Sequence, residues 1–251
     1  MPIPARVRMK PFPRASRKKR VPRFSVIIPT CNRPRFLADA IASVLVQSFH
    51  DLELIVVNDG DALPPLPQDR RIRHLENARR GAIAARNLAV RMARGEAIAW
   101  LDDDDFWCDG THLARAAAAL DAGAAFTFAD GEMRFADGTP PRRFSHGASP
   151  ESLARDNTIL MSAVCYARSL HDELGLFDAD LPFYADWDWH LRVARSGHQM
   201  KHIAAITAAI RIHALNISGV SSQAARQANL SAFASKHGLG PLSLKTHVDF
   251  T

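Results

Sequence analysis

Four consecutive aspartates at 102–105 are the residues of this chain best suited to chemistry. They follow residues 97–101, a short apolar run that predicts a buried strand. Two like charges about 4 Å apart cost roughly 1 kcal/mol in water and about 4 kcal/mol at a protein surface. A fold that gathers carboxylates therefore favours a cation, and Mg2+ binds carboxylates together with substrate phosphates. The alternative is a solvated acidic turn that caps the next helix.

Alternating strands and helices must position these aspartates. Runs rich in β-branched residues predict strands at 24–29, 52–57, 72–75 and 97–101, and apolar spacing predicts helices at 37–45, 82–94 and 111–121, with Gly95 at the end of the second. This alternation predicts an α/β fold with a parallel sheet and helices on both faces. Ligands bind beyond the carboxyl ends of such strands. Polar residues at 29–32, 58–61 and 102–105 should therefore meet at one edge.

The second half of the chain is less regular. We expect a hairpin over 126–135 that turns at Asp130 and Gly131, and a strand at 162–166. Helices are predicted at 168–174 and 186–196, two short strands within 201–213, and a last helix within 221–236.

Composition indicates one globular body with a basic tail. The chain has 251 residues, 47% of them hydrophobic, and three widely spaced cysteines that predict neither disulfides nor a zinc site. The sparse cysteines fit a reducing cytoplasm. No transmembrane run or secretory signal is expected. Residues 1–23 contain nine Lys or Arg and no acid, whereas the remainder is formally −3. We expect residues 1–22 to be disordered. They could be a solubilising extension, could contact anionic lipid at the inner face of the membrane or, least favoured, could bind nucleic acid.

Several motifs follow one another along the chain: FSVIIPTCN at 24–32, DLELIVVNDG at 51–60, GAIAARN at 81–87, LDDDDFW at 101–107, GLFD at 175–178, DWDWHLR at 186–192 and RIHALNIS at 211–218. In this order they resemble the family-2 glycosyltransferases, inverting enzymes with the GT-A fold that transfer sugars from nucleotide-diphosphate donors. The resemblance covers residues 23–220. It implies a nucleotide-sugar half at 23–121, an acceptor half at 122–220, and a C-terminal helix and tail at 221–251.

The resemblance assigns donor-side roles residue by residue. Asp104 matches the ligand of Mg2+ or Mn2+, Asp103 faces the ribose or the metal, and Asp102 opens the Asp-x-Asp motif. His213 matches a histidine that meets the metal or the diphosphate. Asp105 is expected to cap the next segment or orient a ligand water.

The nucleotide pocket is implied by a second set of residues. Asp59 matches the residue that accepts the uracil N–H of a UDP-sugar, or else it is a turn residue before Gly60. The other residues implied at the nucleotide are Pro29, which as a strand terminator is the weakest of them, Thr30, Asn32 and Arg86. Arg86 either pairs with the diphosphate or base, or with a carboxylate of the acidic run. Cys31 replaces the family's usual aromatic residue.

On the acceptor side, Asp186 matches the family's catalytic base, which takes the proton of the acceptor hydroxyl. Asp186 could also cap a helix, and the two roles are compatible. Ala185 replaces a glutamate usual before it. Trp187, Asp188 and His190 are weaker acceptor-side candidates, and His190 could instead be a packed histidine.

The expected function is inverting, metal-dependent transfer from a nucleotide-diphosphate sugar, with UDP favoured, to a glycan or lipid-linked acceptor in cell-envelope synthesis. The alternative is a catalytically impaired glycosyltransferase-like module that docks on anionic surfaces through residues 1–22. A sugar-phosphate nucleotidyltransferase is disfavoured, because the segment after the first strand has no glycine to grip phosphate.

Overall fold

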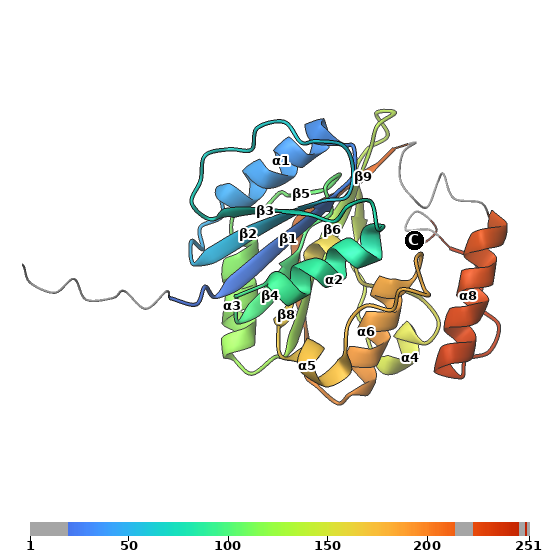
Figure 1. Ribbon diagram of the computed structural model, residues 1–251. Helices are drawn as coiled ribbons and strands as arrows, with labels where there is room; N and C mark the ends of the chain where they lie inside the picture. Colours follow the sequence, from blue (N-terminus) through green and yellow to red (C-terminus); the bar gives the residue numbers. More distant parts are fainter. Residues whose placement is uncertain (1–19, 214–222, 246–248, 250–251) are drawn as a thin grey trace, which may run out of the picture.

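The computed structural model describes residues 20–213, 223–245 and 249 of the chain (Figure 1). Within this part of the chain, a nine-stranded sheet has the order β3-β2-β1-β4-β8-β6-β9-β5, with β7 paired to β6. Helices pack on both faces of the sheet, which confirms the predicted α/β class. The predictions for residues 1–19 lie outside the described residues.

The first four predicted strands form the parallel part of the sheet. They are β1 (Phe24–Thr30), β2 (Leu52–Asn58), β3 (Ile72–Glu76) and β4 (Ala97–Trp100), and β1 lies between β2 and β4. Thr30 pairs with Asn58, so the ends of β1 and β2 lie at the same edge. The run at 102–105 begins two residues after β4 and reaches that edge, as predicted.

The rest of the sheet is mixed. β8 (Val164–Ala167) runs antiparallel to β4 and to β6 (Phe126–Phe135), while β9 (Met200–Ile212) runs parallel to β6. The short strands β5 (Phe106–Trp107) and β7 (Arg142–Phe144) complete it. The hairpin predicted within 126–135 is wrong, because β6 continues as one strand through Gly131, although its register with β9 shifts at Asp130. A side chain at Gly131 would meet Leu160 at 2.5 Å. The two short strands predicted within 201–213 are likewise one strand.

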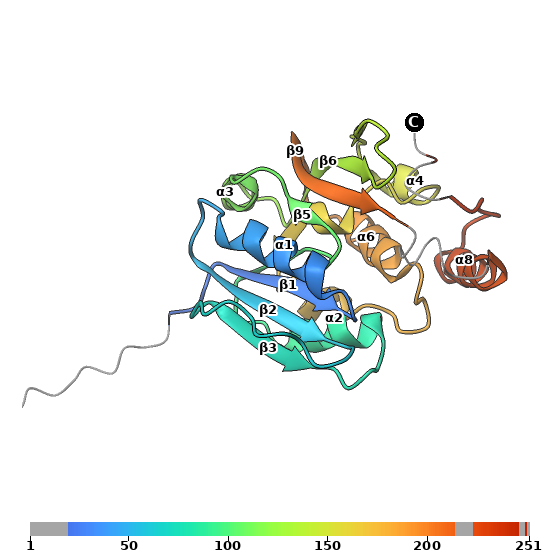
Figure 2. The same ribbon diagram turned by 90° about the horizontal axis from the view of Figure 1, so that it is seen from above.

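Two apolar cores lie on opposite faces of the sheet. Side chains alternate along β1, so Val26 and Ile28 join one core and Ile27 joins the other. The first core packs α1 (Pro34–Leu45) and α3 (His112–Asp121). The second packs α2 (Ala82–Met92), α4 (Pro150–Leu153), α5 (Leu170–Leu174), α6 (Ala185–Arg195) and α8 (Gln223–His237). In both views α8 stands beside α6 at the edge of the molecule (Figures 1 and 2).

Gly95 does not end α2 in the way the sequence predicted. The helix ends at Met92 and Ala93 is extended, whereas Gly95 does not take a positive φ. A Cβ on Gly95 would lie 2.4 Å from the Ser25 backbone nitrogen. Gly95 is therefore needed for close approach to the first strand. None of the helices in the described residues is both long and apolar enough to cross a membrane.

Candidate active site

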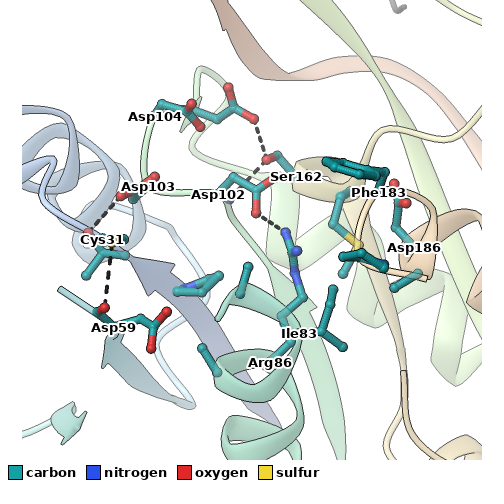
Figure 3. A pocket seen from close by; sticks show the side chains of 18 of the residues that line it. Cys31, Asp59, Ile83, Arg86, Asp102, Asp103, Asp104, Ser162, Phe183 and Asp186 are labelled. Carbon is teal, nitrogen blue, oxygen red and sulfur yellow. Dashed lines mark hydrogen bonds and ion pairs between the residues drawn. The ribbon is translucent and has the colours of Figure 1, made fainter. Parts of the chain in front are cut away.

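A cavity of about 520 Å³ opens at the carboxyl ends of β1, β2 and β4, which is within the usual size range of small-molecule sites. The predicted site residues that line it are Pro29, Thr30, Asp59, Arg86, Asp102, Asp103, Asp104 and Asp186. Figure 3 shows Asp59 and Asp186 on opposite sides, with the acidic run and Arg86 between them. Arg226 of α8 also contributes to the wall.

Arg86 faces the acidic run from the first turns of α2. Its Nη2 donates to Oδ1 of Asp102, and Figure 3 shows the guanidinium pointing at this carboxylate. Burial of Arg86 opposes its charge, but Asp102 and Asp186 together raise its pKa. Arg86 therefore pairs with the acidic run as one alternative predicted, and it lies between that run and Asp186.

Asp103 and Asp104 share Arg33, a residue that the sequence analysis did not single out. Arg33 Nη1 lies 3.1 Å from Asp103 Oδ1 and 2.6 Å from Asp104 Oδ2. Thr30 Oγ1 donates to Asp103 at 2.7 Å, and His213 Nε2 lies 3.3 Å from Asp104 Oδ2. Burial raises the pKa of Asp103 to about 6 and also raises that of Asp104. A basic residue directly after the first polar strand end was the available signal for Arg33.

Asp105 is held entirely by the protein. It accepts a hydrogen bond from Ser162 Oγ at 2.5 Å and another from the Arg211 backbone N–H at 3.0 Å. Its side chain is buried, and burial, followed by Asp104 and Asp102, raises its pKa well above the usual value. Asp105 thus ties the acidic run to β9. Among the described residues, the contacts of the Asp105 side chain are to Ser162 and Arg211, neither of which is part of a cap of the next segment, and Ser162 was not anticipated.

Asp59 lies at the mouth of the cavity after β2. Its carboxylate accepts hydrogen bonds from Asn77 Nδ2 at 2.6 Å and from the Gly81 backbone N–H at 2.9 Å. These donors fix the carboxylate against the start of α2. Asn32 is not among the cavity residues; it has a positive φ of 56°, and its side chain accepts the Asp61 N–H at 2.7 Å. Asn32 therefore shapes the turn next to Asp59.

Asp186 projects from the start of α6 on the far side of the cavity. It is the second residue of the helix, whose N-cap is Tyr184, so the predicted cap role for Asp186 is wrong. Its Oδ2 accepts a hydrogen bond from Asn157 Nδ2 at 3.0 Å. Asn157 was not predicted, because it lies in a polar loop with no local pattern and is defined only by this long-range contact.

The three weaker acceptor-side candidates do not line the cavity. Trp187 is buried, stacks on Phe233 and donates to the Leu153 carbonyl. Asp188 is buried among cations of α6 and α8. His190 is buried as a packed histidine, with burial lowering its pKa to about 4, and its Nδ1 lies 3.2 Å from Asn157 Oδ1.

Comparison with known proteins decides the family. The family described as "Glycosyl transferase family 2" matches residues 25–171, more than half of the chain. The chain belongs to glycosyltransferase family 2. This family-2 glycosyltransferase is 33% identical over 240 residues to the uncharacterized glycosyltransferase YwdF of Bacillus subtilis (strain 168), and the match covers 89% of the chain and 87% of YwdF.

Other relatives match a smaller share of their own length. The putative teichuronic acid biosynthesis glycosyltransferase TuaG of Bacillus subtilis (strain 168) is 35% identical over 148 residues, which cover 55% of this glycosyltransferase and 57% of TuaG. Residues 1–349 of S. aureus TarS in complex with UDP-GlcNAc align with a TM-score of 0.66 and 16% identity, over 85% of this chain and 66% of that one. The mannosyltransferase PcManGT of Pyrobaculum calidifontis, in complex with GDP-Man and Mn2+, aligns with a TM-score of 0.62 and 20% identity, over 91% and 67%. These likenesses confirm the GT-A fold.

Enzymes of this fold commonly use a divalent cation, which the side chains at the acidic run would have to bind. Within the described residues, no cluster of three or more His, Cys, Asp or Glu side chains could hold a metal by itself. Asp104 and His213 nevertheless bring a carboxylate and an imidazole to one point. Mg2+ is usually bound by one or two carboxylates together with substrate phosphates rather than by an all-protein cage. Asp104 and His213 therefore fit a metal that arrives with a diphosphate, in competition with Arg33.

Proposed function

We propose that this glycosyltransferase transfers a sugar, with inversion, from a nucleotide-diphosphate donor to an acceptor hydroxyl. The observation that carries the proposal is one cavity that has Asp59 and Asp186 on opposite sides and the acidic run between them. A donor bound along the strand ends would present its anomeric carbon between these groups. In a single displacement the acceptor oxygen attacks from the face opposite the departing diphosphate, so the base must lie on that face.

The donor is proposed to lie along Pro29, Thr30 and Asp59, with its ribose near Asp103. A UDP-sugar is favoured, because the fixed carboxylate of Asp59 can accept the N–H of uracil. TarS in complex with UDP-GlcNAc and PcManGT in complex with GDP-Man support a nucleotide sugar as the donor. A GDP-sugar is the alternative donor, and comparison of turnover with UDP-sugars and GDP-sugars distinguishes the two.

Asp186 is the proposed catalytic base, which takes the proton from the acceptor hydroxyl as that oxygen attacks the anomeric carbon. Arg86 lies between Asp186 and the acidic run. Its positive charge can reduce the repulsion between these carboxylates and the anionic diphosphate of the donor. Asp104 and His213 are proposed to hold Mg2+ or Mn2+, which supplies positive charge for the departing diphosphate. The Mn2+ complex of PcManGT supports this assignment.

The acceptor is proposed to be a cell-envelope glycan or a lipid-linked precursor. Support comes from the similarity to TuaG, whose name refers to teichuronic acid biosynthesis. A cytoplasmic location and contact between residues 1–22 and an anionic membrane stay predictions. Binding of the full chain and of a form without residues 1–22 to phosphatidylglycerol vesicles tests that contact.

Hydrolysis of nucleotide sugars tests the function without knowledge of the acceptor. The wild-type chain is assayed with UDP-N-acetylglucosamine, UDP-glucose and GDP-mannose, each with Mn2+ or EDTA. We expect metal-dependent release of one nucleotide, loss of Mn2+-dependent donor binding in Asp104→Ala, and retained binding with lost turnover in Asp186→Asn. Asp172→Asn, an exposed residue on α5, is the matched control.

Two outcomes contradict the proposal. Normal turnover in Asp186→Asn would show that another group is the base. Calorimetry that detects no binding of any nucleotide sugar to the wild-type chain would favour the non-enzymatic alternative that Cys31 and Ala185 suggest.

A further inference from the structure

We propose that Asn157 is a positioning residue that holds the base Asp186 in its working orientation, and that His190 in turn fixes the amide of Asn157. The inference rests on the proposed role of Asp186. Asn157 Nδ2 lies 3.0 Å from Asp186 Oδ2, and Asn157 Oδ1 lies 3.2 Å from His190 Nδ1. A loop, the start of α6 and the next turn of α6 thus form one hydrogen-bonded chain.

The chain of hydrogen bonds has a single direction. A carboxylate only accepts, so the NH2 group of Asn157 must face Asp186 and its carbonyl must face His190. His190 Nδ1 therefore carries the proton and donates to that carbonyl. His190 is fully buried, and its Nε2 has no hydrogen-bond partner among the described residues, as expected for a neutral ring with Nε2 unprotonated. Burial, which lowers the pKa of His190 to about 4, keeps the ring neutral at physiological pH.

Asn157 supplies a neutral support next to the base. Residue 185, directly before Asp186, is an alanine and offers no polar group. The amide of Asn157 occupies Oδ2 of Asp186, which leaves Oδ1 for an acceptor hydroxyl. Among the described residues, the charged or titratable groups near Asp186 are Arg86 from α2, Tyr184 and His190 from the N-cap and second turn of α6, and Arg226 from α8, which lines the same cavity. Arg86, Tyr184 and His190 make no direct hydrogen bond to the carboxylate in the described part of the chain, so its orientation depends on Asn157.

Kinetics of Asn157 variants test the inference. The reaction is metal-dependent hydrolysis of whichever of UDP-N-acetylglucosamine, UDP-glucose and GDP-mannose turns over fastest. In Asn157→Ala we expect kcat to fall about 10- to 100-fold, since a misplaced base costs about that much, while KM changes less than about twofold. In Asn157→Asp we expect the acid limb of the kcat–pH profile to move to higher pH by about one unit, because a second carboxylate disfavours ionisation of the first. Thr158→Ala is the control, because the hydroxyl of this neighbouring residue donates to the Gly147 carbonyl rather than to Asp186 or His190.

His190→Phe tests the second link of the chain. The substitution keeps a buried ring and removes the donor to Asn157. We expect a loss of kcat in His190→Phe and no additional loss when it is combined with Asn157→Ala, because both act through one amide. Additive losses in the double variant would overturn the role of His190.

A spectroscopic measurement gives a test that does not require turnover. The side-chain amide resonances of Asn157, identified by their absence in Asn157→Ala, should shift in Asp186→Asn and in His190→Phe and stay in place in Asp172→Asn. Unchanged resonances, or a kcat of Asn157→Ala within twofold of wild type, would overturn the inference. If Asp186→Asn loses turnover while Asn157→Ala keeps it, only the positioning role fails. If Asp186→Asn keeps turnover, the proposed base role of Asp186 fails, and if the wild-type chain turns over no nucleotide sugar, the proposed function itself fails.

Discussion

Replacement of Asp188 by asparagine removes the charge that ties α8 to α6. Asp188 is fully buried, and its carboxylate lies 2.9 Å from Arg192 Nε, 2.6 Å from Lys236 Nζ and 2.9 Å from His237 Nε2. The last two residues belong to the end of α8. Because α8 also supplies Arg226 to the cavity wall, loss of this cluster loosens one side of the site.

The expected cost follows from the ionisation of Asp188. Burial opposes the charge, but the hydrogen bonds from His237 and Lys236 and the charge of Arg192 win, and the pKa falls from 3.8 to about 2. At about 1.4 kcal/mol per pKa unit, this lowering corresponds to about 2.5 kcal/mol of folding free energy. Removal of one partner from a buried ion pair costs about 3–5 kcal/mol. Lys236 is 36% exposed, so water can solvate its charge when Asp188 is neutralised. We therefore expect a cost near the pKa-based value of about 2.5 kcal/mol rather than the value for a fully buried pair.

Urea unfolding followed by circular dichroism at pH 7 measures this loss of unfolding free energy. In thermal unfolding, the Tm should fall by about 5–10 °C for a chain of this size. Asp178→Asn is the matched control: it removes the other carboxylate that contacts Lys236, at 2.6 Å, but this carboxylate is 26% exposed. The control should lose less than about 1 kcal/mol. A loss in Asp188→Asn no larger than that of the control would refute the reasoning.

The pH dependence of the same difference has a definite sign. The folded-state pKa of Asp188 is lowered, so its contribution is present in full above pH 3.8 and is lost as the pH falls toward about 2. The difference in unfolding free energy between wild type and Asp188→Asn should therefore be large at pH 5 and shrink below pH 4. A difference that grows on acidification contradicts the assigned cause.

Three further predictions follow from single contacts. Arg33→Met should raise the affinity for Mn2+ alone, measured by electron paramagnetic resonance, by about tenfold, because it removes a competing cation, whereas the exposed Arg35→Met should not. Gly95→Ala should lower the unfolding free energy by about 1–3 kcal/mol through its clash with backbone, and Gly147→Ala, with open space around it, should not. Burial lowers the pKa of His112 to about 3, so wild-type stability should fall below pH 6.5 by up to about 1.4 kcal/mol per pH unit, and His112→Gln should flatten that slope.

The parallel part of the sheet could be predicted from the sequence because its signals are local. Buried strands such as 24–29 and 52–57 are continuous apolar runs that end in polar residues, and these ends meet because parallel strands share an edge. β6 and β9 were predicted wrongly because their pairing joins segments more than 70 residues apart. Gly131 resembled a turn glycine, whereas its lack of a side chain serves close packing against Leu160.

The site residues likewise fall into those that the sequence could identify and those that only the structure shows. Asp59, Asp104 and Asp186 stand in motifs that a resemblance can identify, and the cavity brings Asp59, Asp104 and Asp186 together. Arg33, Ser162 and Asn157 were missed, because each acts on an aspartate that is distant in sequence and has no motif of its own. These partners decide how each aspartate is held, and only the folded chain shows them.

The acidic run illustrates how partners separate four identical residues. Asp105 accepts hydrogen bonds from Ser162 and from a backbone N–H, and Asp102 pairs with Arg86, so both already have partners within the protein. Asp103 and Asp104 share the single guanidinium of Arg33. A divalent cation and Arg33 therefore compete for the same oxygens, and an anionic diphosphate would offer Arg33 a new partner. On this argument the donor should strengthen metal binding, and by thermodynamic reciprocity the metal should strengthen donor binding by the same factor.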